Sequence, residues 1–298
     1  MSNRIESNPV DFSPSFGDGG SIGDVIDCHQ HFWQYDTNRH SWINDDMHVI
    51  RKDFMPQDLL PVMEVAGVQG TVLVQVDQTE EENNFQLTNA LKFDFIKGVV
   101  GWVDLQAGDI DEKLAYYKQF EKMKGFRHIL QGEADRALML KPAFKNGISL
   151  LGKYVYTYDI LIFPDQLAFA LQLVKAFPNQ RFVIDHAAKP YIKAGEIEEW
   201  QKGMQAIAQL PNVSCKISGM VTEADFKLWT KQQLAPYIDV VVKAFGTNRI
   251  MFGSDWPVCL AAAGYKQWID VLREYFAHFT QAEKEAFFGS NATTFYNL

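Results

Sequence analysis

The chain has 298 residues and a formal net charge of −9, with 47% hydrophobic and 22% charged residues. This composition is that of a globular protein and argues against a disordered chain. The negative balance, without a dense Lys/Arg run, argues against a nucleic-acid partner. No apolar run reaches the ~18 residues that span a bilayer, so we also predict no membrane association.

The first 24 residues are rich in Ser, Asn, Asp, Gly and Pro and contain no apolar stretch of the secretory-signal kind. We interpret residues 1–24 as a flexible lead before a single domain, residues 25–298. The three cysteines, Cys28, Cys215 and Cys259, form no Cys-x-x-Cys pair. Their sparse use is typical of a reducing compartment and predicts a cytoplasmic protein.

From residue 25 onward, short apolar or β-branched runs alternate with longer amphipathic segments, the pattern of βα units. Helical spacing is clearest from Pro56 to Gly67, from Pro164 to Phe177 and from Trp229 to Gly246. Eight runs are predicted strands: 25–33, 70–77, 96–105, 124–130, 156–162, 181–188, 213–219 and 249–256. No Gly-x-Gly-x-x-Gly follows the first run, which disfavours an open dinucleotide-binding sheet. We therefore predict an α/β fold, a (β/α)₈ TIM barrel.

Titratable residues follow three of these strands where the apolar run ends. His29 and His31 lie two apart in the first strand and face the same side. His186 follows the apolar run 182–184, and Asp255 follows the run 250–252. Strands of such a barrel present their carboxyl ends at one face, where active sites lie. We therefore predict that these four residues share a site.

Imidazole nitrogens and a carboxylate are suitable ligands for zinc or a similar divalent ion. The candidate metal ligands are therefore His29, His31, His186 and Asp255. The predicted cofactor is one divalent metal ion, with zinc as the first candidate, and the alternative is that the protein uses no metal. Asp255 is the candidate general base, because a carboxylate beside a bound water can accept its proton. His186 is the second candidate catalytic residue. Without a metal, His186, Arg127 or His128 would donate to the developing negative charge.

Four motifs in order carry a resemblance to a known family. They are Val-Ile-Asp-Cys-His-Gln-His-Phe-Trp at 25–33, Phe-Val-Ile-Asp-His-Ala-Ala-Lys-Pro at 182–190, Lys-Ile-Ser-Gly at 216–219 and Met-Phe-Gly-Ser-Asp-Trp-Pro at 251–257. From about residue 25 to the end, the chain resembles the amidohydrolase superfamily, in its branch of sugar-acid lactonases similar to L-fuconolactonase and L-rhamnono-lactonase. The resemblance implies a distorted (β/α)₈ barrel in which the four site residues supply metal or catalytic groups.

One departure from this resemblance concerns the number of metals. Many members of the superfamily hold two metals through a carbamylated lysine at the end of the fourth strand. This chain has Phe126, Arg127 and His128 there, and its Lys124 lies at the start of that strand. The departure favours at most one metal.

Long loops follow the first and fourth strands, at 34–55 and 131–141, and such loops cover the substrate face of a barrel. Tryptophan faces pack on the C–H face of a sugar, and polar groups bind its hydroxyls. The candidate substrate-binding residues are Trp33, Trp42, Gln75, Asp104, Arg127, His128, Lys189 and Trp256. For Trp33 and Trp256 the alternative is barrel packing, and for the polar residues it is an outer salt bridge.

The resulting hypothesis is a hydrolase that opens a sugar-acid lactone, such as L-fuconolactone or L-rhamnonolactone, by attack of an activated water. A first alternative is a hydrolase or decarboxylase of a cyclic or aromatic carboxylate, which would need several arginines at the barrel mouth. A second is a non-catalytic barrel, which would not need four titratable residues at strand ends. The partner is then a small-molecule lactone, and a homo-oligomer is left open.

Overall fold

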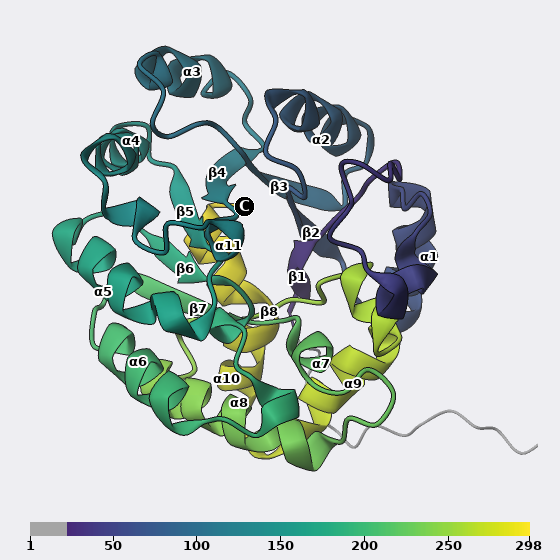
Figure 1. Ribbon diagram of the computed structural model, residues 1–298. Helices are drawn as coiled ribbons and strands as arrows, with labels where there is room; N and C mark the ends of the chain where they lie inside the picture. Colours follow the sequence, from purple (N-terminus) through teal and green to yellow (C-terminus); the bar gives the residue numbers. More distant parts are fainter. Residues whose placement is uncertain (1–22) are drawn as a thin grey trace, which may run out of the picture.

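Eight parallel strands form one sheet in which their spatial order is their order along the chain. The computed structural model describes residues 23–298, so the predicted lead lies outside the described residues except for its last two. A bridge between Gln30 and Trp256 joins the first strand to the segment after the last. There the N–H of His31 donates to the carbonyl of Trp256 at 2.7 Å, and that of Asp255 to the carbonyl of His29 at 2.8 Å. The sheet therefore closes into the predicted (β/α)₈ barrel (Figure 1).

Each predicted run coincides with a strand that is shorter than the run. The strands are β1 Ile26–Gln30, β2 Gly70–Val74, β3 Ile96–Gly101, β4 Met123–His128, β5 Thr157–Ile160, β6 Phe182–Ile184, β7 Val213–Ile217 and β8 Ile250–Phe252. Only β4 begins outside its run, by one residue. The predicted runs are too long because their last residues leave the sheet and enter loops at its carboxyl end. The pairing register shifts within β1–β2, β2–β3 and β3–β4, so the barrel is distorted, as predicted.

Helices surround the strands (Figure 1). They are α1 Pro56–Ala66, α2 Glu80–Lys92, α3 Ile110–Tyr117, α4 Pro142–Lys153, α5 Leu167–Ala176, α6 Glu198–Ala208, α7 Met220–Glu223, α8 Lys231–Phe245, α9 Tyr265–Tyr275, α10 Gln281–Glu285 and α11 Asn291–Tyr296. Helix α1 begins with Pro56 and is followed by Gly67 as its C-cap, whose φ of 66° suits glycine. The predicted helix from Pro164 divides into a 3-10 turn, Pro164–Gln166, and α5.

The last helix, α11, lies in the centre of the ring of helices rather than in the ring itself (Figure 1). Its Phe295 and Tyr296 pack with Val72, Val100 and Val183 of the strands in one buried apolar cluster. An added Cβ at Gly98, near the start of β3, would meet Leu298 at 2.9 Å. The end of the chain therefore covers the barrel where the strands begin, and the carboxyl ends of the strands form the open face. No helix within residues 23–298 has the length and apolarity to cross a bilayer.

Candidate active site

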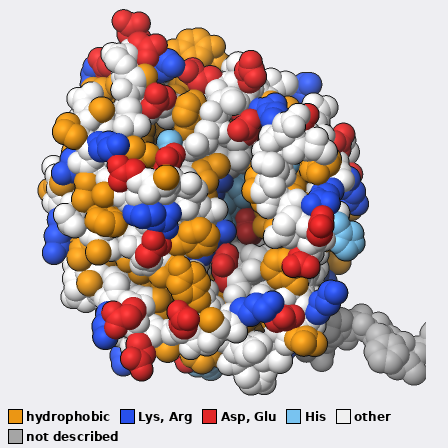
Figure 2. Space-filling model, in the orientation of Figure 1, with side chains coloured by type: hydrophobic (Ala, Val, Ile, Leu, Met, Phe, Trp, Pro, Cys, Tyr) orange, Lys and Arg blue, Asp and Glu red, His pale blue; other side chains and the backbone are white. Residues whose placement is uncertain are grey.

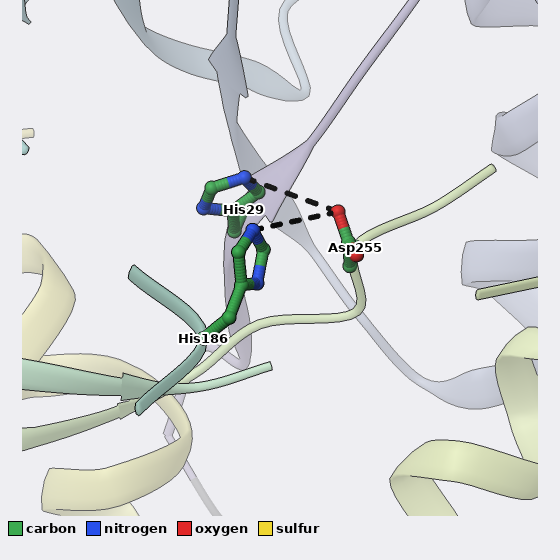
Figure 3. Close-up of side chains that lie close together, drawn as sticks. All are labelled: His29, His186 and Asp255. Atoms are coloured by element: carbon green, nitrogen blue, oxygen red, sulfur yellow. Dashed lines mark ion pairs between the residues drawn. The ribbon is translucent and has the colours of Figure 1, made fainter. Parts of the chain in front are cut away.

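Three imidazoles converge on one oxygen of Asp255. Oδ1 of Asp255 lies 3.2 Å from Nε2 of His31, 3.9 Å from Nε2 of His186 and 4.0 Å from Nε2 of His29. Figure 3 shows His29 and His186, from β1 and from the turn after β6, both directed towards Asp255. The structure thus brings together the four residues that we expected to meet, while their roles stay predictions.

Tight turns with left-handed backbone place two of these side chains. Strand β6 ends at Ile184, and the four residues from His186 to Lys189 then have φ values of 49–57°. Asp255 has a φ of 58°. Each such conformation costs a non-glycine residue about 1–3 kcal/mol and persists only where the surrounding packing imposes it. Strain of this kind is concentrated at functional sites, which supports the assignment of His186 and Asp255 to the site.

A buried cluster of charged residues lies against His29. Nζ of Lys216 is 2.6 Å from Oδ2 of Asp159, 3.0 Å from Oδ1 of Asp185 and 3.1 Å from Nδ1 of His29. Nη1 of Arg127 is 3.0 Å from Oδ2 of Asp185 and 3.2 Å from Nε2 of His29. Two cations and two carboxylates balance one another, as buried charges must. The cluster therefore fixes His29 from both sides of its ring.

Burial sets the protonation states of the site. Burial, with the charge of Lys216, holds the pKa of His29 well below its ordinary value. Burial also lowers the pKa of His186 to about 4, although Asp255 opposes the shift. For Asp255, burial alone would raise the pKa, but His186 and His31 hold it below its ordinary value. At neutral pH the site therefore combines an ionised carboxylate with neutral His29 and His186.

The donor atoms suit one divalent ion. One atom each from His29, His186 and Asp255 lies within 4.8 Å of the others. Nδ1 of His31 lies 2.7 Å from the carbonyl oxygen of Val74 and must carry the proton that this carbonyl accepts. In neutral His31 the lone pair on Nε2 then faces the carboxylate of Asp255 at 3.2 Å, a contact that a shared cation or proton stabilises. A metal at about 2.0–2.2 Å from each ligand fits such spacings.

A cavity of about 250 Å³ opens above these residues. Its lining includes the polar residues His31, His186 and Asp255 and the apolar residues Val76 and Leu161. At roughly 30 Å³ for each water, it has room for about eight waters, the size of a single substituted ring. Figure 2 shows the open face of the barrel hollowed near its centre, with histidine and charged side chains visible inside the hollow.

A family model described as amidohydrolase matches residues 26–298. The chain belongs to this amidohydrolase family. The L-fucono-1,5-lactonase of Burkholderia multivorans is 35% identical over 284 residues, which cover 92% of this chain and 96% of that protein. The L-fucono-1,5-lactonase of Burkholderia ambifaria is 36% identical over 277 residues, with 92% and 95% covered.

A solved structure confirms the fold. The crystal structure of an amidohydrolase from Burkholderia multivorans with bound zinc has a TM-score of 0.89 and 36% identity to this chain. The match covers 92% of this chain and 99% of that one. In the present amidohydrolase, Lys124 donates to the carbonyl of Asn297 at the closed end of the barrel, whereas Arg127 lies at the site.

The predicted substrate-binding residues divide into two groups. Trp42, Arg127 and Lys189 line the cavity, with Trp42 on its rim at 41% exposure. Five others do not line it: Trp33, Gln75, Asp104, His128 and Trp256. Trp33 and Trp256 are buried among Phe32 and Phe54, the packing role that the sequence left open.

The three polar residues outside the cavity are engaged elsewhere. Gln75 donates to the carbonyl of Arg127 at 3.1 Å. Nε2 of His128 lies 2.7 Å from Glu133. The carboxylate of Asp104 accepts from the N–H of Gln106 at 2.9 Å.

Sequence reasoning did not select several residues that the structure brings to the site. Ser218 Oγ lies 2.9 Å from Nδ1 of His186, and Glu223 lies 3.3 Å from Nζ of Lys189. Gln131 lines the cavity. The Lys-Ile-Ser-Gly motif already contained Ser218, and Gln131 begins the long loop after the fourth strand. The sequence therefore indicated the two segments that contain Ser218 and Gln131, but not these residues themselves.

Proposed function

We propose that the protein is a hydrolase that opens a sugar-acid lactone, an aldonolactone such as L-fuconolactone or L-rhamnonolactone, by attack of water. The observation that carries the proposal is the convergence of His29, His31 and His186 on Oδ1 of Asp255 beside a cavity of one-ring size. The identity of 35–36% to proteins named L-fucono-1,5-lactonase supports the choice of substrate class.

The residues supply the groups that lactone hydrolysis needs. Ionised Asp255 accepts a proton from the attacking water, which adds to the lactone carbonyl carbon. Arg127 and Lys189 line the cavity and can donate to the oxyanion that forms. The bond from the carbonyl carbon to the ring oxygen then breaks, and the proton held by Asp255 passes to that oxygen, which gives a hydroxy acid.

The four converging residues are also the proposed ligands of one divalent ion. Zinc is the first candidate, because the related amidohydrolase from Burkholderia multivorans has a structure with bound zinc. Such an ion would lower the pKa of the water and polarise the carbonyl. With or without it, His186 and His31 hold the pKa of Asp255 below its ordinary value, so the carboxylate that lines the cavity stays ionised.

Charge favours a neutral lactone over a carboxylated substrate. Of the two long cationic side chains that line the cavity, Arg127 is paired with Asp185 at 3.0 Å and Lys189 with Glu223 at 3.3 Å. Neither therefore offers the uncompensated positive charge that a second carboxylate on the substrate would need. A decarboxylase or dicarboxylate hydrolase is disfavoured on the same ground.

A pH-indicator assay tests this function, because each lactone opened near neutral pH releases one proton. The panel contains L-configured aldonolactones, their D-configured counterparts and a lactone bearing free carboxylates, with Asp255→Asn as the blank for spontaneous opening. We expect enzyme-dependent turnover of at least one aldonolactone and none of the carboxylated lactone. Turnover confined to carboxylated substrates would contradict the proposal.

We also propose a cytoplasmic location. Cys28, Cys215 and Cys259 are all free and buried, which supports a reducing compartment. Localisation of a tagged chain by fractionation tests this point separately.

A further inference from the structure

Gln131 lines the cavity, and its side-chain amide has no hydrogen-bond partner within residues 23–298. Its Oε1 is buried and unpaired, and its Nε2 donates to no other group in residues 23–298. Four other glutamines also have an unpaired buried Oε1, but each donates through its Nε2: Gln30, Gln75, Gln86 and Gln180. Gln131 is therefore the glutamine of this set whose whole amide is unused, whichever way the amide is oriented.

The backbone of Gln131 is held firmly although its side chain is unpaired. Its N–H donates to the carbonyl of Leu161 at 3.0 Å, and its carbonyl accepts from Arg136 at 2.9 Å. Arg136 in turn makes two hydrogen bonds to the carboxylate of Asp165. On the other side, the N–H of Ile129 donates to Gln78 at 2.7 Å. The segment is thus fixed, and the Gln131 amide is presented to the cavity from a rigid support.

Apolar residues share the cavity wall with Gln131. Ile129, Leu161 and Val76 line the same cavity and offer no side-chain hydrogen bond. A buried, unpaired amide oxygen in such surroundings is unfavourable until a ligand supplies a donor. An amide presents an NH2 donor group and a carbonyl acceptor in one plane, and a hydroxyl group can donate to the oxygen or accept from the NH2. The apolar neighbours are suited to the C–H groups of the same ring.

We propose that Gln131 is a specificity-determining residue that binds a ring hydroxyl of the lactone and so selects hydroxylated lactones over deoxy or alkyl lactones. The proposal rests on the proposed lactonase function and adds to it a residue and the substrate group that it binds. A site built to pair a hydroxyl discriminates against the analogue that lacks it, because the protein group is then left unpaired.

A double-mutant-type cycle, in which Gln131 is changed in the enzyme and one hydroxyl is removed from the substrate, tests this role. The variant is Gln131→Met, which keeps the length of the side chain and removes both polar groups. The substrates are the aldonolactone that the wild type opens fastest and its monodeoxy analogues. In the wild type, removal of one particular hydroxyl should lower kcat/KM by about 10- to 100-fold. In Gln131→Met the parent lactone should lose about the same factor, and removal of that hydroxyl should then have little further effect.

Two further variants make the result specific. Gln131→Asn, which withdraws the amide by one methylene, should lose the same discrimination. Gln119→Met is the matched control, because Gln119 lies exposed between α3 and β4, and its side chain hydrogen-bonds only to Tyr116 within residues 23–298. It should keep the wild-type pattern. Melting temperatures of all variants exclude unfolding as the cause.

Each contrary outcome has a separate meaning. If every deoxy analogue carries the same penalty in the wild type and in Gln131→Met, Gln131 binds no hydroxyl and the inference is wrong. If Gln131→Met lowers turnover of all substrates equally, its role is structural and the inference is also wrong. If the wild type opens no lactone at all, the proposed function fails, and this role fails with it.

Discussion

The hydroxyl of Tyr296 donates to Oδ2 of Asp159 at 2.7 Å. This bond joins the last helix, at the closed end of the barrel, to the buried charges beneath the site. The same carboxylate oxygen lies 2.6 Å from Nζ of Lys216, which is 3.1 Å from Nδ1 of His29. A continuous series of polar contacts therefore runs through the barrel, from the end of the chain to the candidate active site.

We expect the two substitutions Lys216→Met and Tyr296→Phe to differ strongly in their effect on stability. Lys216→Met leaves Asp159 and Asp185 buried without the cation that pairs with both, which should cost about 3–5 kcal/mol. Tyr296→Phe removes one hydrogen bond to a carboxylate, for about 1.5–3 kcal/mol. Urea unfolding curves of the two variants give the comparison. If both variants lose the same unfolding free energy, Lys216 does not neutralise Asp159 and Asp185 in the way that its distances to them indicate.

The sequence could predict the strands and the site at their ends, because apolar runs that stop at a titratable residue have a local signature. It could not predict that Asp159 and Lys216 pair with each other. Both lie in predicted strands, in the runs 156–162 and 213–219, and both are fully buried. They come from β5 and β7, which are not neighbours in the sheet. Their contact depends on how the whole barrel closes.

The tryptophans show a second limit of sequence reasoning. Trp33, Trp42 and Trp256 have the same side chain and lie in or beside site motifs, yet only Trp42 lines the cavity. Trp33 donates from its indole to the carbonyl of Lys52, which turns its ring into the loop. The direction of a ring in a loop depends on tertiary contacts that residue type does not encode.

We expect Asp255→Asn to abolish turnover and leave the fold intact. Asparagine is nearly isosteric but cannot accept the proton of the attacking water, and loss of a positioned general base usually lowers the rate about 10²–10⁴-fold. The alternative, a structural cap for the segment after Pro257, predicts a lower melting temperature with near-normal turnover. The cap of that segment is Pro257, which has no side-chain hydrogen bond to it. Lactone hydrolysis and thermal melting of this variant decide between the two.

We expect at most one equivalent of divalent metal per chain. One cluster of His and Asp donors is present in residues 23–298, and Arg127 lies beside it where a bridging lysine would be needed for a second ion. Elemental analysis of the purified protein measures the stoichiometry. Two equivalents would contradict the prediction. Full activity after exhaustive chelation would remove the metal from the mechanism and leave water activation to Asp255.

The pH dependence of stability should carry the signature of Glu82. This carboxylate, in the first turn of α2, accepts the N–H groups of Val76 and Asp77 at 2.5 and 2.6 Å and the amide of Gln86 at 3.0 Å. Burial raises its pKa from 4.5 to about 7, and the two backbone donors only partly oppose that shift. The folded protein therefore holds a proton on Glu82 over a pH range in which the unfolded chain has released it.

The sign of the effect follows from this difference in proton binding. A carboxyl group whose pKa is higher in the folded than in the unfolded state makes its full contribution to stability below the unfolded pKa, here 4.5. This contribution is lost as the pH rises to the folded pKa of about 7. Since a tenfold change in proton affinity is worth about 1.4 kcal/mol, the loss for Glu82 is about 3 kcal/mol. In Glu82→Gln no proton can dissociate, so this part of the pH dependence should disappear.

Unfolding free energies of the wild type and Glu82→Gln between pH 4 and pH 8 therefore test the assignment. We expect the variant to gain stability relative to the wild type as the pH rises, by up to about 3 kcal/mol. At low pH the variant should be the less stable of the two. In the wild type the N–H groups of Val76 and Asp77 donate to the two different oxygens of Glu82, whereas a Gln side chain has only one oxygen. Glu81→Gln, which removes an exposed carboxylate from the same turn, is the control for the loss of one negative charge. If the curves of the wild type and Glu82→Gln stay parallel over this range, Glu82 binds its proton equally well in the folded and unfolded states, and the two backbone N–H groups fully offset the effect of burial on its pKa.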